Sequence, residues 1–213
     1  MTTVYLIRHG QSIGNKLGRF LGQTDLDLSE LGYEQAEQTR RYFENIAVDA
    51  VYSSDLMRAF NTVAPIARDK NIEIIPDREL REIACGRWEN QLFEDLKVKF
   101  KSDYDVWLTD IGNARCTDGE SVAELLERIR LEIERIAAEN DGKTVVIGTH
   151  ATPIRCMTCY LRGLPITAMK DIAWVSNASI TRIEYNNGVG SIKEYAYDGH
   201  LGQIKSAFNG NNV

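Results

Sequence analysis

The sequence predicts an α/β fold in three layers: a mostly parallel sheet with one antiparallel edge strand, and helices on both faces of that sheet. Short apolar runs typical of buried strands alternate along the chain with longer stretches of helical periodicity. Residues 4–7 and 144–149 are apolar or small almost throughout, as expected for strands covered on both faces. Residues 179–185 and 191–197 flank Asn186-Asn187-Gly188, a pattern typical of a hairpin that completes the sheet.

Length and composition indicate an ordinary globular protein. The 213 residues fit a single domain over residues 1–213, with 43% hydrophobic and 26% charged residues. The net charge of −6 disfavours nucleic acid and anionic membranes as partners. The first apolar run is too short to span a membrane and lacks the features of a signal peptide, so we expect a cytoplasmic protein. The oligomeric state stays open, with a homodimer as one alternative.

The first half of the chain gives two predicted helices between three strands. Ser29 is a candidate N-cap for a helix that runs to about Asn45. A short strand follows over residues 49–53, and Ser54 is a candidate N-cap for the next helix. Residues 72–76 predict a third strand. The apolar stripes of the two helices are Leu31, Ala36, Phe43 and Ile46 in the first, and Leu56, Ala59, Val63 and Ile66 in the second.

The second half contains the clearest helix. Residues 77–90 show no clean period and a polar helical region follows them. A helix is then predicted after Ser121, and a buried strand over 144–149 ends at His150. Pro153 suits the first turn of a further helix. The continuous apolar face of the clearest helix consists of Val122, Leu125, Leu126, Ile129, Ile133 and Ile136.

The four cysteines are Cys85, Cys116, Cys156 and Cys159. Cys156 and Cys159 form a C-x-x-C pattern, but they fall inside a predicted helix and not at the strand-to-helix junction of a redox pair. We interpret them as buried thiols, as for Cys85 and Cys116, and expect no redox or metal role.

Arg8-His9-Gly10 at the end of the first strand is the strongest functional signal. Strand ends at the carboxyl edge of a sheet are where α/β proteins place their chemistry. An imidazole beside an obligate cation, followed by a glycine that allows close backbone approach, suits an oxyanion such as phosphate. A solvated strand end is the alternative, because three-residue motifs recur by chance. His150 ends a second buried strand in the same way, whereas His200 lies in a polar segment and is expected to be solvated.

The motifs taken together resemble the histidine phosphatase superfamily, the phosphoglycerate mutase-like proteins with an Arg-His-Gly motif. The resemblance covers nearly the whole chain, and the motifs keep the family's order. They are Leu6-Ile7-Arg8-His9-Gly10 with Asn15; Gly18-Arg19-Phe20-Leu21-Gly22 with Asp25; Leu28-Ser29-Glu30-Leu31-Gly32 with Gln35-Ala36; Ser53-Ser54-Asp55-Leu56-Met57-Arg58-Ala59 with Thr62; Leu80-Arg81-Glu82-Ile83 with Gly86 and Trp88-Glu89; Gly119-Glu120-Ser121; and the strand ending at His150.

The resemblance implies a metal-independent phosphomonoester hydrolase that needs no cofactor and acts on a small phosphorylated metabolite. His9 would be the nucleophile that becomes phosphohistidine, and Glu82 would protonate the leaving oxygen and then activate water. Arginine forks neutralise a transferring phosphoryl group without a metal, which agrees with these roles. The catalytic set implied is His9, Glu82, Arg8, Arg58 and His150. The phosphate- or substrate-binding set implied is Arg8, Asn15, Leu21, Gly22, Arg58, Glu82, His150 and Ala151.

Four alternatives stay open at this stage. A cofactor-dependent phosphoglycerate mutase would share the first half-reaction, although the segment around Glu82 resembles the shorter phosphatases and no basic insertion is visible. A non-catalytic phospholigand-binding protein would not need Glu82. A metal site of His9, His150 and Glu82 is disfavoured because nearby arginines would repel a cation. Arg58 and Glu82 could also be surface residues, with Glu82 paired to Arg78 or Arg81.

Two positions depart from the family pattern. Ala151 follows the second histidine where glycine is common, and Leu21 stands where glutamine is frequent. Neither departure removes a catalytic group, but both leave the identity of the leaving group undetermined.

Overall fold

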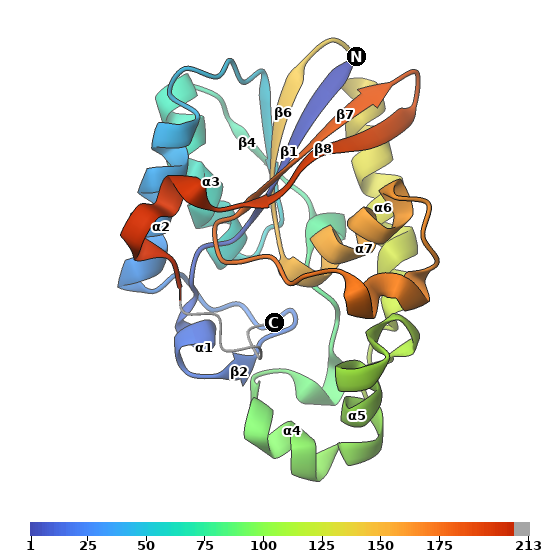
Figure 1. Cartoon of the computed structure of the whole chain (residues 1–213). Helices are drawn as coiled ribbons and strands as arrows, with labels where there is room; N and C mark the ends of the chain where they lie inside the picture. The colour runs from blue at the N-terminus through green and yellow to red at the C-terminus, as the bar shows by residue number, and fades with distance from the viewer. Residues whose placement is uncertain (207–213) are drawn as a thin grey trace.

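The computed structural model describes residues 1–206 and confirms the predicted three-layer α/β architecture (Figure 1). Among these residues the main sheet has six strands in the order β4-β3-β6-β1-β7-β8. Its strands are β1 (Thr2–Arg8), β3 (Ala50–Ser53), β4 (Ile74–Pro76), β6 (Thr144–Thr149), β7 (Ile180–Asn186) and β8 (Val189–Tyr197). The pairs β4–β3, β3–β6 and β6–β1 are parallel, and β7 runs antiparallel between β1 and β8. The single antiparallel strand is therefore β7, which is not the edge strand itself, because β8 pairs with its outer side.

Helices cover both faces of this sheet (Figure 1). Helices α2 (Glu30–Tyr42) and α3 (Met57–Lys70) lie on one face, and α6 (Val122–Glu139) and α7 (Ala151–Leu161) lie on the other. A smaller group of elements lies beyond the carboxyl ends of the parallel strands and contains a two-stranded antiparallel sheet of β2 and β5. This group comprises α1 (Ile13–Lys16), β2 (Arg19–Phe20), β5 (Gln91–Leu92), α4 (Phe93–Lys99) and α5 (Lys101–Thr109).

Short 3₁₀-helices connect these elements and shape the loops of the sheet's carboxyl edge. They are η1 (Arg78–Leu80), η2 (Gly86–Trp88), η3 (Ile111–Asn113), η4 (Ile166–Asp171) and η5 (Gly199–Ile204). Two of them, η1 and η2, fall in residues 77–90, where the sequence shows no clean period.

Strand β1 contributes to two hydrophobic cores because its side chains alternate between the faces of the sheet. Val4 and Leu6 pack in the larger core with α6 and α7, while Tyr5 and Ile7 pack in the smaller core on the opposite face. Strands β6 and β7 also form backbone hydrogen bonds with β1, one on each of its edges. These contacts hold the end of β1, and therefore Arg8 and His9, in a fixed position.

Helix α6 forms as its sequence predicts. Ser121 is the N-cap, and it exchanges hydrogen bonds with Glu124 in a capping box. Leu125, Ile129 and Ile133 on its apolar face are fully buried. Pro153 lies in the first turn of α7, as predicted.

Three local predictions are wrong. The helix after Ser29 ends at Tyr42 and not near Asn45. The N-cap of α3 is Leu56 and not Ser54, whose hydroxyl instead lies 2.9 Å from a ring nitrogen of His150. His200 is half-buried and not solvated.

Tertiary packing explains the position of His200. Its ring packs against the rings of Tyr42 and Tyr197, and its Nε2 lies 3.2 Å from the Thr39 hydroxyl. Burial lowers the pKa of His200 to about 4. His200 therefore belongs to the packing of η5 on α2, which the polar composition of its segment does not reveal.

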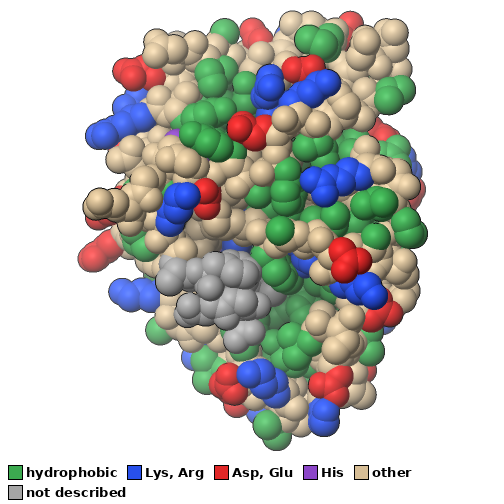
Figure 2. All heavy atoms as spheres, in the orientation of Figure 1, with side chains coloured by type: hydrophobic (Ala, Val, Ile, Leu, Met, Phe, Trp, Pro, Cys, Tyr) green, Lys and Arg blue, Asp and Glu red, His purple; other side chains and the backbone are tan. Residues whose placement is uncertain are grey.

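Two observations describe the helices and the charge on one face of the molecule. Over residues 1–206, no helix is long and apolar enough to cross a membrane. Figure 2 shows Lys and Arg side chains interspersed with Asp and Glu side chains over the visible face. On this face the Lys and Arg side chains are scattered and do not gather into one basic patch.

Candidate active site

His9 follows the last residue of β1 and is buried, with 3% of its surface exposed. Its backbone N–H donates to the Thr149 carbonyl of β6, and its Nδ1 lies 2.7 Å from the Gly10 carbonyl oxygen. Since a carbonyl can only accept, Nδ1 carries the ring proton and Nε2 keeps its lone pair. Burial, Arg58 and Arg8 lower the pKa of His9 well below its ordinary value. His9 is therefore a neutral imidazole with a nucleophilic Nε2 near pH 7.

Arg8 and Arg58 supply positive charge beside His9, and both are buried. Arg58 comes from the first turn of α3 and donates to the carbonyl oxygens of Thr24, at 2.8 Å, and Gly22, at 2.6 Å. Arg8 donates through Nη1 to the Val175 carbonyl. Burial lowers the pKa of each to about 10, so both guanidinium groups stay charged at neutral pH. The alternative of Arg58 as a solvated helix residue is wrong.

Asn15 presents its amide N–H₂ because other groups hold its carbonyl oxygen. Its Oδ1 accepts from the Ser12 backbone N–H at 3.1 Å and from Asn177 Nδ2 at 3.2 Å. Asn177 also donates to the His9 carbonyl at 3.2 Å. These bonds orient Nδ2 of Asn15 as a fixed donor.

Glu82 is buried between two backbone donors. Its carboxylate accepts from the N–H of Ile83 at 2.8 Å and of Thr152 at 3.3 Å. Burial raises the pKa of Glu82 despite these bonds and Arg58. The alternative of a surface pair with Arg81 is wrong, because Arg81 forms a two-pronged ion pair with Asp55.

His150 lies beside His9, with ring centroids 5.2 Å apart. It is the N-cap residue of α7 and is fully buried. Burial, then Arg58 and His9, lower its pKa well below the ordinary value. Its Nε2 contacts Ser54, so Nδ1 is the nitrogen left for a further contact.

The electrostatics of the His9 cluster suit an oxyanion; this cluster consists of Arg8, His9, Asn15, Arg58, Glu82, His150 and the supporting Asn177. The buried nitrogens without a hydrogen-bond partner within residues 1–206 include Arg58 Nε, Asn15 Nδ2 and His150 Nδ1. They come from α3, α1 and the start of α7, which converge beside His9. In the same residues no group of three or more His, Cys, Asp or Glu side chains could hold a metal ion. Phosphate oxygens would supply the acceptors that buried donors require.

The other predicted binding residues have different surroundings. The Gly22 carbonyl holds Arg58, and a Cβ there would meet Cys85 Sγ at 2.2 Å. The Leu21 side chain packs against Gly14, and Ala151 is buried at the first turn of α7. Their contact with substrate stays a prediction.

The structure adds three residues that the sequence interpretation did not assign to the site. Asn177 fixes Asn15, Ser54 contacts His150, and the Thr62 hydroxyl accepts from the Gly10 N–H while donating to the Arg58 carbonyl. Thr62 and Ser54 belong to motifs of the family resemblance, which was the available signal. Asn177 belongs to no such motif and arrives through the loop before β7.

The cysteines are buried thiols, as predicted. Cys156 and Cys159 both lie within α7, and all four cysteines are free. Burial raises the pKa of Cys156 and of Cys159, so these thiols stay protonated near neutral pH.

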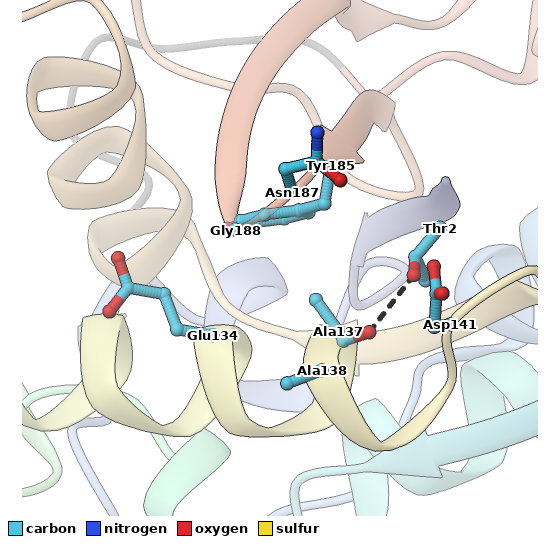
Figure 3. A pocket seen from close by; sticks show the side chains of 8 residues that line it. All are labelled: Thr2, Glu134, Ala137, Ala138, Asp141, Tyr185, Asn187 and Gly188. Atoms are coloured by element: carbon cyan, nitrogen blue, oxygen red, sulfur yellow. Dashed lines mark hydrogen bonds between the residues drawn. The ribbon is translucent and has the colours of Figure 1, made fainter.

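A separate cavity of about 520 Å³ lies near the start of β1, between α6 and the β7–β8 hairpin (Figure 3). It is lined by Thr2, Glu134, Ala137, Ala138, Asp141, Tyr185, Asn187 and Gly188. No arginine or histidine lines it, and its two carboxylates would repel phosphate. The cavity therefore does not compete with the His9 cluster as an oxyanion site.

Known proteins resemble this chain over nearly its full length. Phosphoserine phosphatase 1 of Hydrogenobacter thermophilus is 31% identical over 96% of each chain. A protein of Yersinia pestis named "Probable phosphoglycerate mutase GpmB" is 29% identical over 87% of this chain and 86% of its own.

Solved structures share the fold. YhfR of Bacillus stearothermophilus superposes with a TM-score of 0.91 at 25% identity, covering 94% of this chain and all of the other. A phosphoserine phosphatase mutant of Entamoeba histolytica, solved with phosphoserine, gives a TM-score of 0.82 at 28% identity, with 94% and 100% coverage.

The family model "Histidine phosphatase superfamily (branch 1)" matches residues 4–198. This span contains all the residues of the His9 cluster described above, from Arg8 to Asn177. The chain belongs to the histidine phosphatase superfamily, branch 1.

Proposed function

We propose that the protein is a metal-independent phosphomonoesterase that hydrolyses a small phosphorylated metabolite through phosphohistidine. The observation that carries this proposal is the neutral His9, with Nδ1 bonded to Gly10 and two buried arginines beside it. The geometry supports attack by Nε2 on phosphorus. The relatives named as phosphatases support hydrolysis as the overall reaction.

In the first step, His9 Nε2 forms a bond to phosphorus while the bond from phosphorus to the leaving oxygen breaks. Protonated Glu82 gives its proton to that oxygen, which leaves as an alcohol. Arg8, Arg58, Asn15 and His150 neutralise and hold the three remaining phosphoryl oxygens.

In the second step, water attacks the phosphorus of phosphohistidine. Glu82, now a carboxylate, takes a proton from this water, and the bond between phosphorus and Nε2 breaks. The products are inorganic phosphate, neutral His9 and protonated Glu82. The charges of the starting site are restored.

We propose the substrate class from the names of the similar proteins. Structures of the Entamoeba histolytica phosphoserine phosphatase were solved with phosphoserine and with 3-phosphoglyceric acid. Glucosyl-3-phosphoglycerate phosphatase and α-ribazole phosphatase also share the fold. We propose a small phosphomonoester, with phosphoserine and 3-phosphoglycerate to be assayed first.

A mutase is the second candidate, favoured by the likeness to the Yersinia pestis protein. It would keep the same phosphohistidine but transfer the phosphoryl group to a second hydroxyl. Incubation with 3-phosphoglycerate and a catalytic amount of the bisphosphate separates the two. We expect free phosphate to exceed 2-phosphoglycerate, and rapid isomerisation with little phosphate release would support the mutase.

The decisive test is to trap the intermediate. The enzyme is quenched during turnover of ³²P-labelled phosphoserine or of 4-nitrophenyl phosphate, and the modified residue is mapped by mass spectrometry in alkali. Label on His9 supports the proposal, and His9→Asn should abolish it. Label on a serine or cysteine would overturn it.

A further inference from the structure

Ser54 directly follows β3 and lies beside the end of β6, where His150 is the N-cap of α7. The side chain is fully buried, and the Ser54 backbone N–H donates to the Gly148 carbonyl at 2.8 Å. This bond fixes Ser54 against β6. It brings Ser54 Oγ to 2.9 Å from His150 Nε2.

The positions of the hydrogen atoms in this contact follow from which neighbouring groups can donate and which can accept. Ser54 Oγ accepts from the Leu56 backbone N–H at 3.4 Å. Within residues 1–206, the other hydrogen-bond contact of this oxygen is His150 Nε2. A buried hydroxyl that fails to donate costs free energy, so its proton points at Nε2. Nε2 of a neutral His150 is then an acceptor, and the ring proton is on Nδ1.

This tautomer decides what His150 can offer to a phosphoryl group. Nδ1 is buried and without a partner in the described part of the chain, and its ring lies 5.2 Å from that of His9. With the proton on Nδ1, a neutral ring donates to a phosphoryl oxygen. With the proton on Nε2, the lone pair of Nδ1 would face that oxygen and repel it.

We propose that Ser54 is a positioning residue that holds neutral His150 in the Nδ1–H tautomer, ready to donate to the transferring phosphoryl group. The part of this inference that concerns the phosphoryl group rests on the proposed function. The tautomer itself does not. The charged and titratable groups acting on His150 are Arg58 of α3, His9 and Arg8 at the end of β1, and Arg128 of α6, and all of them disfavour a protonated ring.

The first experiment reads the tautomer directly. Long-range ¹H–¹⁵N correlation spectra of ¹⁵N-histidine-labelled protein are recorded at pH 7.5, and the three histidines are assigned with His9→Asn and His200→Asn. We expect a protonated Nδ1 and a bare Nε2 at His150. A protonated Nε2 in the wild type would overturn the proposal, whatever the enzyme's activity.

Two variants test whether Ser54 causes this state. In Ser54→Ala we expect the His150 ring to move to the Nε2–H tautomer or a mixture. Ser53→Ala is the matched control, because Ser53 is an equally buried neighbour whose hydroxyl donates to the Ser54 carbonyl instead. The control should keep the wild-type spectrum. An unchanged His150 spectrum in Ser54→Ala would assign the tautomer to another cause and overturn the proposal.

The second experiment measures anion affinity against pH with sulfate, whose charge is constant between pH 5 and 9. Ser54→Ala should bind sulfate about tenfold more weakly than the wild type at pH 8, because His150 no longer donates a hydrogen bond to the charged ligand. Because the pKa of His150 lies well below 6.5, its ring stays neutral from pH 7 to 9, and the loss should be the same across that range. Ser53→Ala should bind sulfate like the wild type, and an equal loss in that control would indicate a merely structural role. If the spectra and the sulfate affinities are as expected but no phosphomonoester is hydrolysed, the proposed function is contradicted and the tautomer assignment stands.

Discussion

The four cationic or potentially cationic side chains of the site share one buried region, and burial lowers the pKa of every one of them. For the arginines the result is still a full charge, because a pKa of about 10 lies well above neutrality. For the histidines the result is a neutral ring. One region thus combines fixed positive charge for a phosphate with an unprotonated nucleophile, and the difference follows from the ordinary pKa values of the two residue types.

The same reasoning predicts the pH dependence of turnover. The lowered pKa of His9 keeps the nucleophile neutral until the pH falls well below 6.5, so the acid limb of the rate should lie below that of an ordinary histidine. Because the pKa of Glu82 is raised, its side chain stays protonated at pH values above 4.5. The rate should decline as the pH rises through that raised pKa, because Glu82 then loses the proton that the leaving oxygen needs. Profiles of kcat/KM for phosphoserine from pH 4 to 9 test both limbs.

Glu82→Gln should remove the basic limb and reveal the proton's role. An alkoxide needs a proton to leave, so phosphorylation of His9 by phosphoserine should slow by about 10²–10⁴-fold. Nitrophenolate leaves without one and should be affected much less. Single-turnover measurements isolate this step from the later hydrolysis. An equal loss for both substrates would mean that Glu82 is not the acid.

Asn177→Ala should weaken phosphate binding without removing a group that contacts phosphate. Loss of its bond to Asn15 Oδ1 lets the Asn15 amide rotate, at a cost of about 0.5–1.5 kcal/mol, or roughly two- to tenfold in affinity. Inorganic phosphate titrated by calorimetry provides the measurement. Combining this change with Asn15→Ala should add little further loss. Additive losses would show that Asn177 acts independently of Asn15.

Among the elements, α6 illustrates a segment whose sequence signals agree. A capping box, an apolar face and i,i+4 ion pairs such as Arg130–Glu134 all indicate one helix, and the structure has it. Ser54 illustrates the opposite case. A serine near a helix start is a sound cap candidate, but the same hydroxyl can bond an imidazole, and only the packing of β3 beside β6 brings that imidazole near.

Ser121→Ala should destabilise the fold and leave the chemistry intact. Loss of the capping bond typically costs about 0.5–2 kcal/mol. Chemical denaturation should show a lower midpoint, with kcat and KM unchanged at temperatures where the variant is folded. Ser102→Ala on the exposed surface of α5 is the control and should unfold like the wild type. Reduced kcat in folded Ser121→Ala would reveal coupling between this cap and the site.

At the scale of the whole molecule, the sequence predicts the fold class and the neighbourhood of His9, Arg8, Arg58, Glu82 and His150. These residues stand at strand ends or in ordered motifs, where local pattern and topology together determine location. It does not predict Asn177 or the burial of His200. Both positions depend on loops that pack against elements distant in the sequence. The local periodicity of a segment does not indicate such contacts.

Oxyanion binding should stabilise the whole protein, with no metal required. Inorganic phosphate that binds only the folded state adds about 2.7 kcal/mol at one hundred times its dissociation constant. Thermal unfolding with added phosphate, against chloride at equal ionic strength, should show a higher Tm before and after treatment with a chelator. Arg58→Ala should lose most of this shift. A shift that disappears on chelation would revive the metal site.

The central place of β1 has a consequence for how the protein is made. Thr3 pairs with Thr144 on one side and Glu184 on the other, so β1 leaves the ribosome long before either neighbouring strand exists. Contacts so distant in sequence close slowly, and until they form both edges of an apolar strand are open to aggregation. Two residues that support the site are also synthesised late. Asn177 donates to Asn15, and the carbonyl of Val175 accepts from Arg8. Phosphate affinity and a protected central strand should therefore emerge in the same late folding event.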